Sequence, residues 1–111
     1  MHKLKGFERT YLRGLAHGIK PVVQIGKGGL TDEVIASIRE ALAARELIKI
    51  KFNEHKEEKK ELAGQIEEVT DSEMAGMVGN VAIFFKENDD TAKRKVKLLV
   101  KDKKSEIKKA R

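Results

Sequence analysis

Four consecutive residues, Gly26-Lys27-Gly28-Gly29, join backbone freedom to a positive charge and directly follow a short apolar run. A glycine-rich loop between a strand and a helix lets the main chain approach a phosphate closely, because no Cβ atom intervenes and the amides at the start of the helix point outward. Several kinds of phosphate ligand are bound in this way, so the residues around the loop have to distinguish among them.

Two nucleotide-binding motifs do not fit these residues. A P-loop requires G-x-x-x-x-G-K-[ST], whereas Lys27 comes second in the loop and no Lys-Ser or Lys-Thr pair follows. The dinucleotide fingerprint starts at Gly26 and Gly28 but has Thr31 in place of its third glycine, and it lacks the later acidic residue. A G-x-x-G clamp remains, of the kind with which KH domains grip single-stranded RNA, with Lys27 and Gly28 at its tip. A tight turn without any ligand is the alternative.

The charge of the chain is gathered at its two ends. The 111 residues contain 24 Lys and Arg against 18 Asp and Glu, a net charge of +6. Residues 1–30 carry +5, residues 31–90 carry −7 and residues 91–111 carry +8. Such clustering indicates a polyanionic partner, most commonly nucleic acid, although membrane surfaces and acidic proteins also qualify. For the last eleven residues, a tail that is merely solvated is an equal alternative.

Hydrophobic spacing divides the chain into seven elements. Leu4, Phe7, Tyr11 and Leu15 have helical spacing and predict a helix over residues 3–17, which cannot continue through Pro21. Caps, alternation and turn residues predict the others. These are a strand at 22–25, a helix that begins after Thr31, a strand at 48–52, a helix over 55–70, and a hairpin whose strands, 74–78 and 81–86, join at Gly79-Asn80.

The order helix, strand, helix, strand, helix, strand, strand predicts an α/β chain of the two-layer α+β type. Each helical crossover implies a βαβ unit, and the hairpin adds an antiparallel edge to a four-stranded mixed sheet. We assign residues 1–87 to this domain and residues 88–111 to a basic, partly disordered C-terminal extension, because residues 101–111 have almost nothing to bury. Within the extension, Val96 and the apolar run Leu98 to Val100 could dock as a short strand or helical turn.

Seven basic side chains could extend the glycine loop into one phosphate-binding surface. They are Lys20 and Lys27 beside the glycines, Lys49 and Lys51 on the second strand, and Lys5, Arg9 and Arg13 on the first helix. The strand lysines alternate with apolar residues, which predicts one covered and one basic face. The helix residues recur every fourth position, roughly opposite the predicted apolar stripe, which predicts a basic outer face. Because Asp32 and Glu33 follow the glycines, a nucleic-acid backbone is expected to cross the loop tip.

Other chemistry finds little support in the residue types. The chain has no cysteine, and its three histidines, His2, His17 and His55, lie far apart without the spacing of metal ligands. We therefore expect no catalytic site, no metal and no cofactor. The absence of a signal peptide and of an apolar run of about 18 residues predicts a soluble, cytoplasmic protein without a membrane contact. Phe7 and Tyr11 are expected in the core. Of the adjacent Phe84 and Phe85, one is expected in the core, while the other covers the exposed side of the sheet or touches RNA.

Three separated stretches resemble one known family. They read LRGLAH at residues 12–17, KPVVQIGKGGLT at residues 20–31 and ELIKIK at residues 46–51. In this order and spacing they resemble the CRM domain, named for chloroplast RNA splicing and ribosome maturation, and more narrowly the stand-alone bacterial YhbY-type proteins. The resemblance covers about residues 3–86. It implies an αβαβαββ domain similar to the C-terminal domain of translation initiation factor three, RNA binding through Gly26 to Gly29, and association with precursors of the large ribosomal subunit.

Three hypotheses on function follow. The leading one is a non-catalytic RNA-binding protein, monomeric by default, that assists assembly of the large ribosomal subunit and takes no small-molecule substrate. The second is a protein-interaction module whose acidic middle, residues 31–90, binds a basic ribosomal protein. The third, which depends on the glycine loop alone, is an enzyme that acts on nucleotides or RNA.

Overall fold

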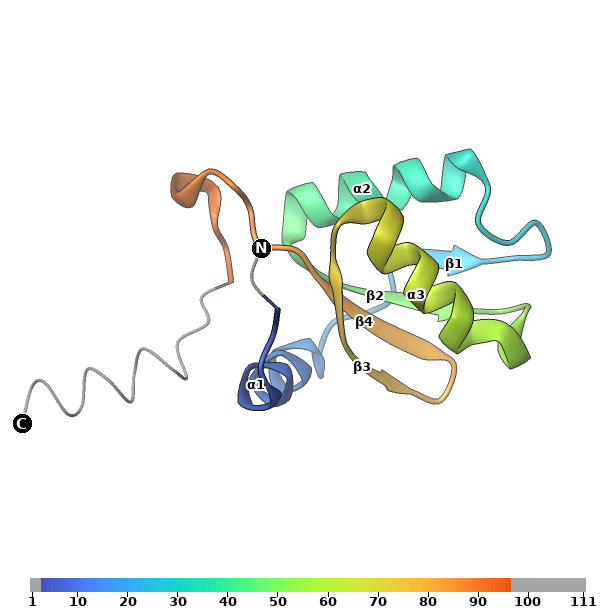
Figure 1. Cartoon of the computed structure of the whole chain (residues 1–111), viewed down its shortest axis with the longest axis horizontal. Coiled ribbons are helices and arrows are strands. Elements are labelled where there is room, and N and C mark those ends of the chain that lie inside the picture. Colours follow the sequence, from blue (N-terminus) through green and yellow to red (C-terminus); the bar gives the residue numbers. More distant parts are fainter. Residues whose placement is uncertain (1–2, 97–111) are drawn as a thin grey trace, which may run out of the picture.

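The computed structural model describes residues 3–96 of the chain. Figure 1 shows three α-helices around one four-stranded sheet. The elements are α1 (Gly6–Ala16), β1 (Val23–Ile25), α2 (Asp32–Arg45), β2 (Leu47–Phe52), α3 (Lys59–Thr70), β3 (Glu73–Val78) and β4 (Val81–Phe85), with 3-10 helices η1 (Lys56–Glu58) and η2 (Thr91–Lys93). The predicted order and α+β class are confirmed, and η1 replaces the first turn of the third predicted helix.

Local signals in the sequence fix several boundaries. The hydroxyl of Thr31 accepts the N–H of Val34 at 3.2 Å and caps α2 as predicted. Gly79 adopts a φ of +58° in the turn between β3 and β4, which is the conformation expected of glycine in a tight hairpin.

The sheet is mixed, with the strand order β1-β2-β4-β3. β1 is parallel to β2, whereas β4 is antiparallel to both of its neighbours. The hairpin therefore adds an antiparallel edge, as predicted. The chain crosses from β2 through α3 to β3 at the edge of the sheet, and β4 then fills the position between β2 and β3. Residues 82–85 of β4 are all buried, because a central strand is covered on both faces.

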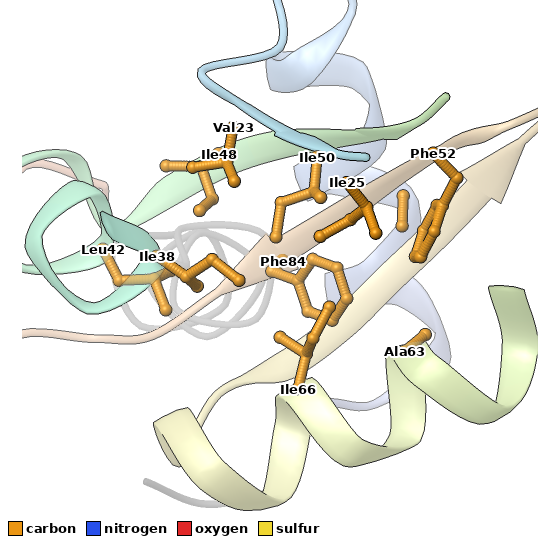
Figure 2. Packing of buried hydrophobic residues seen from close by; sticks show 11 residues of the cluster. Val23, Ile25, Ile38, Leu42, Ile48, Ile50, Phe52, Ala63, Ile66 and Phe84 are labelled. Carbon is orange, nitrogen blue, oxygen red and sulfur yellow. The ribbon is translucent and has the colours of Figure 1, made fainter. Parts of the chain in front are cut away.

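A buried core lies on each face of the sheet. Figure 2 shows the larger one, where α2 and α3 cover the sheet; it comprises Val23, Ile25, Ile38, Leu42, Ile48, Ile50, Phe52, Ala63, Ile66, Ala82 and Phe84. On the other face α1 covers a smaller core of Leu4, Leu12, Ala16, Leu47, Ala75, Ile83 and Phe85. Neighbouring strand residues point to opposite faces, so Phe84 and Phe85 are each fully buried in a different core. The expectation that only one of them is core was wrong.

α1 presents to the sheet a different side from the predicted one. Leu12 and Ala16 are completely buried, whereas Phe7 and Leu15 keep 37% and 44% of their surface exposed. Tyr11 is half-buried. The buried side is thus displaced by one residue from the predicted stripe, which corresponds to about 100° around the helix. The apolar stripe that the sequence predicts as core therefore lies largely outside it.

Two arginines of α1 bind the edge strand β3. Arg9 donates from Nη2 to Glu73 Oε2 at 2.8 Å, and Arg13 donates from Nη1 to the carbonyl of Ala75 at 2.9 Å. The Arg13 stem crosses Gly76, where an added Cβ would lie 2.5 Å from its Cδ atom. Both side chains are held against β3, although Arg13 is exposed and Arg9 is half-buried, so the predicted basic outer face of the first helix is partly engaged by the fold.

The first residues of the C-terminal extension are attached to the domain by Glu46. This residue, with a φ of +66°, is buried between α2 and β2, and its carboxylate accepts the backbone N–H groups of Asn88, Lys95 and Val96 at 2.5, 2.6 and 2.7 Å. Val96 packs against the core under α1. The division at residue 87 and the disorder of the tail stay predictions, since residues 97–111 lie outside the described part.

Candidate nucleic-acid interface

The glycine loop lies at the carboxyl end of β1, where the chain turns into α2 (Figure 1). The N–H of Gly29 donates to the carbonyl of Gly26 at 3.1 Å, which closes a four-residue turn. Lys27 and Gly28 form the exposed tip of this turn. Among residues 3–96, no acceptor receives the backbone N–H of either tip residue. The loop therefore presents two unpaired backbone donors beside a lysine, a combination that can bind an anionic oxygen.

His55 holds the loop from the neighbouring strand end. It follows β2, has a left-handed φ of +56°, and its Nε2 atom lies 2.8 Å from the carbonyl oxygen of Lys27. Its Nδ1 atom lies 3.5 Å from Glu58 Oε1. The hydrogen bond to the Lys27 carbonyl, followed by that to Glu58, raises the pKa of His55 above its ordinary 6.5. A protonated ring can donate to both oxygens at once, so protonation favours the held loop.

The three loop glycines differ in what the fold requires of them. Gly29 has a φ of +70°, which residues with a Cβ rarely adopt. A Cβ on Gly28 would lie 3.2 Å from the Thr31 methyl group, whereas a Cβ on Gly26 would have no atom within 4 Å, and neither residue has a positive φ. The fold thus favours glycine at position 29 and accepts a side chain at position 26.

Acidic residues surround the loop on two sides. Asp32 and Glu33 occupy the exposed first turn of α2. A shallow hollow next to Lys27 is lined by Glu54, Glu57 and Glu58, together with Asn53, His55 and Lys56. These carboxylates disfavour a phosphate on both sides, and the remaining side of the loop is the β1–β2 part of the sheet.

That side is a polar surface that α1 leaves uncovered, and we call it the open face; it comprises Val22, Gln24, Lys49 and Lys51. Gln24 and Lys51 are exposed and are paired in the β1–β2 register. Lys49 is half-buried and its Nζ atom lies 3.5 Å from the carbonyl of His17, at the end of α1. The predicted alternation along β2 is confirmed, although the face that carries the lysines is only partly free.

The structure separates the predicted basic residues into two groups. Lys20 precedes β1, and the two lysines of the open face lie on β2. The N–H of Val22 donates to the carbonyl of Lys49, so these lysines lie along the β1–β2 pair that leads to Lys27. Arg9 and Arg13 are bound to β3, the opposite edge of the sheet. Lys5 precedes α1 and adjoins Leu4, whose N–H donates to Glu73 of β3. An RNA-binding role for each of these residues stays a prediction.

Sequence reasoning did not identify His55 or Asn53 as part of the loop site. Asn53 donates from Nδ2 to Gln24 Oε1 at 2.5 Å, and its N–H donates to the carbonyl of Ile25. A usable signal existed, because residues that follow two adjacent parallel strands meet at the same edge of the sheet. Both residues follow β2 directly, as the glycines follow β1.

Within residues 3–96, no three His, Asp or Glu side chains lie close enough together to bind a metal ion. In the same part of the chain, no helix has the length and apolar character needed to cross a membrane.

Sheet order, helix placement and loop define a small α+β domain with a G-x-x-G turn between a parallel strand and a helix. The chain belongs to the CRS1 / YhbY (CRM) domain family, whose model matches residues 4–86. This confirms the resemblance drawn from the three sequence stretches.

Several known proteins share this similarity. The Bacillus subtilis protein named "Probable RNA-binding protein YqeI" is 36% identical over 88 residues, which are 78% of this chain and 92% of that protein. A Haemophilus influenzae protein named "RNA-binding protein" is 32% identical over 91 residues, covering 81% of this chain and 92% of its own. The solution structure of SAV1595 from Staphylococcus aureus matches with a TM-score of 0.71 and 37% identity, covering 86% of this chain and 100% of the other.

Proposed function

We propose that this protein binds single-stranded RNA through its glycine loop and the adjacent open face, without catalysing a reaction on it. The observation that carries the proposal is the pair of unpaired N–H groups of Lys27 and Gly28 at an exposed tip with one lysine. Backbone donors and a cation contact phosphate irrespective of the base, so the loop grips the RNA backbone. The names of the relatives, which include RNA-binding proteins, support RNA as the polyanion.

The electrostatics of the surface give the RNA a direction. From the loop tip the strand passes over Lys51 and Lys49 toward Lys20, since the acidic hollow and the first turn of α2 repel it elsewhere. Arg9 and Arg13 are engaged with β3, so they contribute at most a distant positive field. Affinity therefore depends on phosphate contacts and falls with increasing salt, with a log–log slope of about 0.7 for each phosphate contacted.

A charge reversal at the loop tip tests this function. Lys27→Asp combined with Gly28→Asp opposes phosphate at the loop tip, where both side chains are exposed, and is expected to abolish most binding to single-stranded RNA in fluorescence anisotropy. The matched control, Lys60→Asp with Gln65→Asp, makes the same change of charge at exposed positions of α3, behind the opposite face of the sheet. Circular dichroism verifies that both variants fold. Equal RNA affinity of the loop variant, the control and the unchanged chain would refute the proposed site.

We further propose that the RNA is ribosomal and belongs to precursors of the large subunit, as the family resemblance implies. In cell lysates, the tagged chain is expected to sediment with particles that precede the mature large subunit, and the loop variant is expected to leave them. Sedimentation of both forms at the top of the gradient would contradict this assignment while leaving RNA binding itself intact.

The acidic middle offers a weaker basis for function. Part of its charge is used inside the fold: Glu46 binds the C-terminal segment, Glu67 accepts the N–H of Met74, and Glu73 binds Arg9 and Leu4. Nuclease treatment distinguishes RNA binding from binding of a basic ribosomal protein, because a protein held by acidic residues would remain bound after RNA is removed.

A further inference from the structure

An apolar stripe on α1 faces outward and continues into a groove. Phe7, Tyr11 and Leu15 lie four residues apart, on one side of the helix. The outer two keep 37% and 44% of their surface exposed. Tyr11 and Leu15 also line a groove whose other walls are Ile19, Arg45, Leu47, Lys95 and Val96. Nothing within residues 3–96 covers Phe7 and Leu15 fully, although Leu12 and Ala16, on the neighbouring side of the helix, are completely buried.

The C-terminal segment reaches this groove in a fixed position. Lys95 and Val96 form its far wall, and their backbone N–H groups are both held by Glu46 Oε1, at 2.6 and 2.7 Å. Charge-assisted bonds from one buried carboxylate to successive amides are short and strong. The described chain thus ends with Val96 packed against the core under α1, as Ile19 is.

The sequence then continues with Lys97, Leu98, Leu99 and Val100. Four extended residues reach about 13 Å, whereas the stripe from Leu15 to Phe7 rises about 12 Å along the helix axis. The apolar run is therefore long enough to cover the stripe from its anchored end. Tethering at Val96 also gives the run an effective concentration in the millimolar range, which no free partner matches without its own affinity.

We propose that the run Leu98 to Val100 docks on the α1 stripe of Phe7, Tyr11 and Leu15 within the same molecule. In an extended run Leu98 and Val100 point to the same side and cover the stripe, whereas Leu99 points to the other side. The basic residues 101–111 would start beside α1, at the end of the sheet away from the glycine loop. This proposal does not depend on the proposed RNA binding.

Tyr11 provides the probe, because it is the only tyrosine in a chain without tryptophan. Acrylamide quenching of its fluorescence is measured on the full chain at several protein concentrations, first without RNA and then with added single-stranded RNA. The test variant changes Leu98, Leu99 and Val100 each to Ser. The matched control changes Lys101, Lys103 and Lys104 each to Ser, which removes tail charge and keeps the apolar run. A second variant, Leu15→Ser, weakens the stripe itself at an exposed position.

Docking predicts that Tyr11 is protected in the full chain and in the lysine control, and that protection is lost in the triple apolar variant and reduced in Leu15→Ser. Equal quenching in the full chain and the triple apolar variant would overturn the proposal. Protection that rises with protein concentration would assign the stripe to a second copy instead. Protection that arises only on addition of RNA would assign it to the nucleic acid, and either result also overturns intramolecular docking.

Discussion

Exchanging single glycines of the loop for alanine separates what the fold requires from what a ligand requires. Gly29→Ala places a Cβ on a residue with a φ of +70°, which costs about 1–2 kcal/mol. For a domain of this size, each kcal/mol lowers the melting temperature by about 4–8 °C. Gly26→Ala adds a methyl group where no atom lies within 4 Å and φ is not positive. Stability should be unchanged or rise by about 0.4–1 kcal/mol, since alanine reduces the entropy of the unfolded chain.

RNA affinity is expected to change in the opposite pattern for Gly26→Ala. Its methyl group points into open space at the edge of the loop, where it would keep a phosphate away from the backbone. Urea unfolding and fluorescence anisotropy with single-stranded RNA measure both quantities on one sample. The matched control is Gly64→Ala in α3, a site that also has no neighbour within 4 Å. A Gly29→Ala variant as stable as the unchanged chain would refute the loop conformation, and undiminished RNA affinity of folded Gly26→Ala would refute close approach at that glycine.

Three further predictions follow from individual side chains. Because the hydrogen bond to the Lys27 carbonyl, and then Glu58, raise the pKa of His55, its stabilisation of the loop is complete below about pH 6.5 and is lost as pH rises through the higher folded value; an NMR titration of the Gly28 amide should have a midpoint above 6.5 that His55→Ala abolishes. Lys51→Glu should weaken RNA binding in anisotropy without loss of stability, whereas Lys60→Glu on α3 should not; equal effects would argue against the open face. Phe85→Ala should lower the free energy of unfolding in urea by about 3–5 kcal/mol, since the ring is fully buried; a loss below 1 kcal/mol would contradict its place in the core.

Local signals were sufficient to predict most of the fold. Thr31 and Gly79 mark a helix start and a hairpin turn by side-chain and backbone chemistry that acts within four residues. The alternation of Ile48 and Ile50 with lysines gave the faces of β2, because strand periodicity leaves only two choices.

The rotation of α1 could not be predicted from its own residues. Its apolar residues define two neighbouring sides, one with Phe7 and Leu15 and one with Leu12 and Ala16; the second is buried against the sheet, together with the bonds of Arg9 and Arg13 to β3. These contacts join residues more than 60 positions apart, which no helical periodicity encodes. The same holds for Glu46, whose buried carboxylate and positive φ depend on backbone amides of the C-terminal segment.

Only the part of the loop site that is contiguous in the sequence was predictable. The glycines and Lys27 form one contiguous motif and were found directly, whereas His55 reaches the loop only because β1 and β2 are adjacent and parallel. Lys20, Lys49 and Lys51 lie along the same two strands, but the three basic residues of the first helix lie toward the opposite edge.

Binding of RNA backbone by the loop and the open face is tested most directly by NMR mapping of the full chain with a single-stranded RNA at fixed salt concentration. The largest amide shift changes are expected at Gly26 to Gly29, Gln24 and Lys51, with little change in α3. The changes at the loop should disappear in the Lys27→Asp and Gly28→Asp double variant. Absence of any change, or changes confined to α3 or to the acidic hollow at Glu54, Glu57 and Glu58, would contradict the proposed interface.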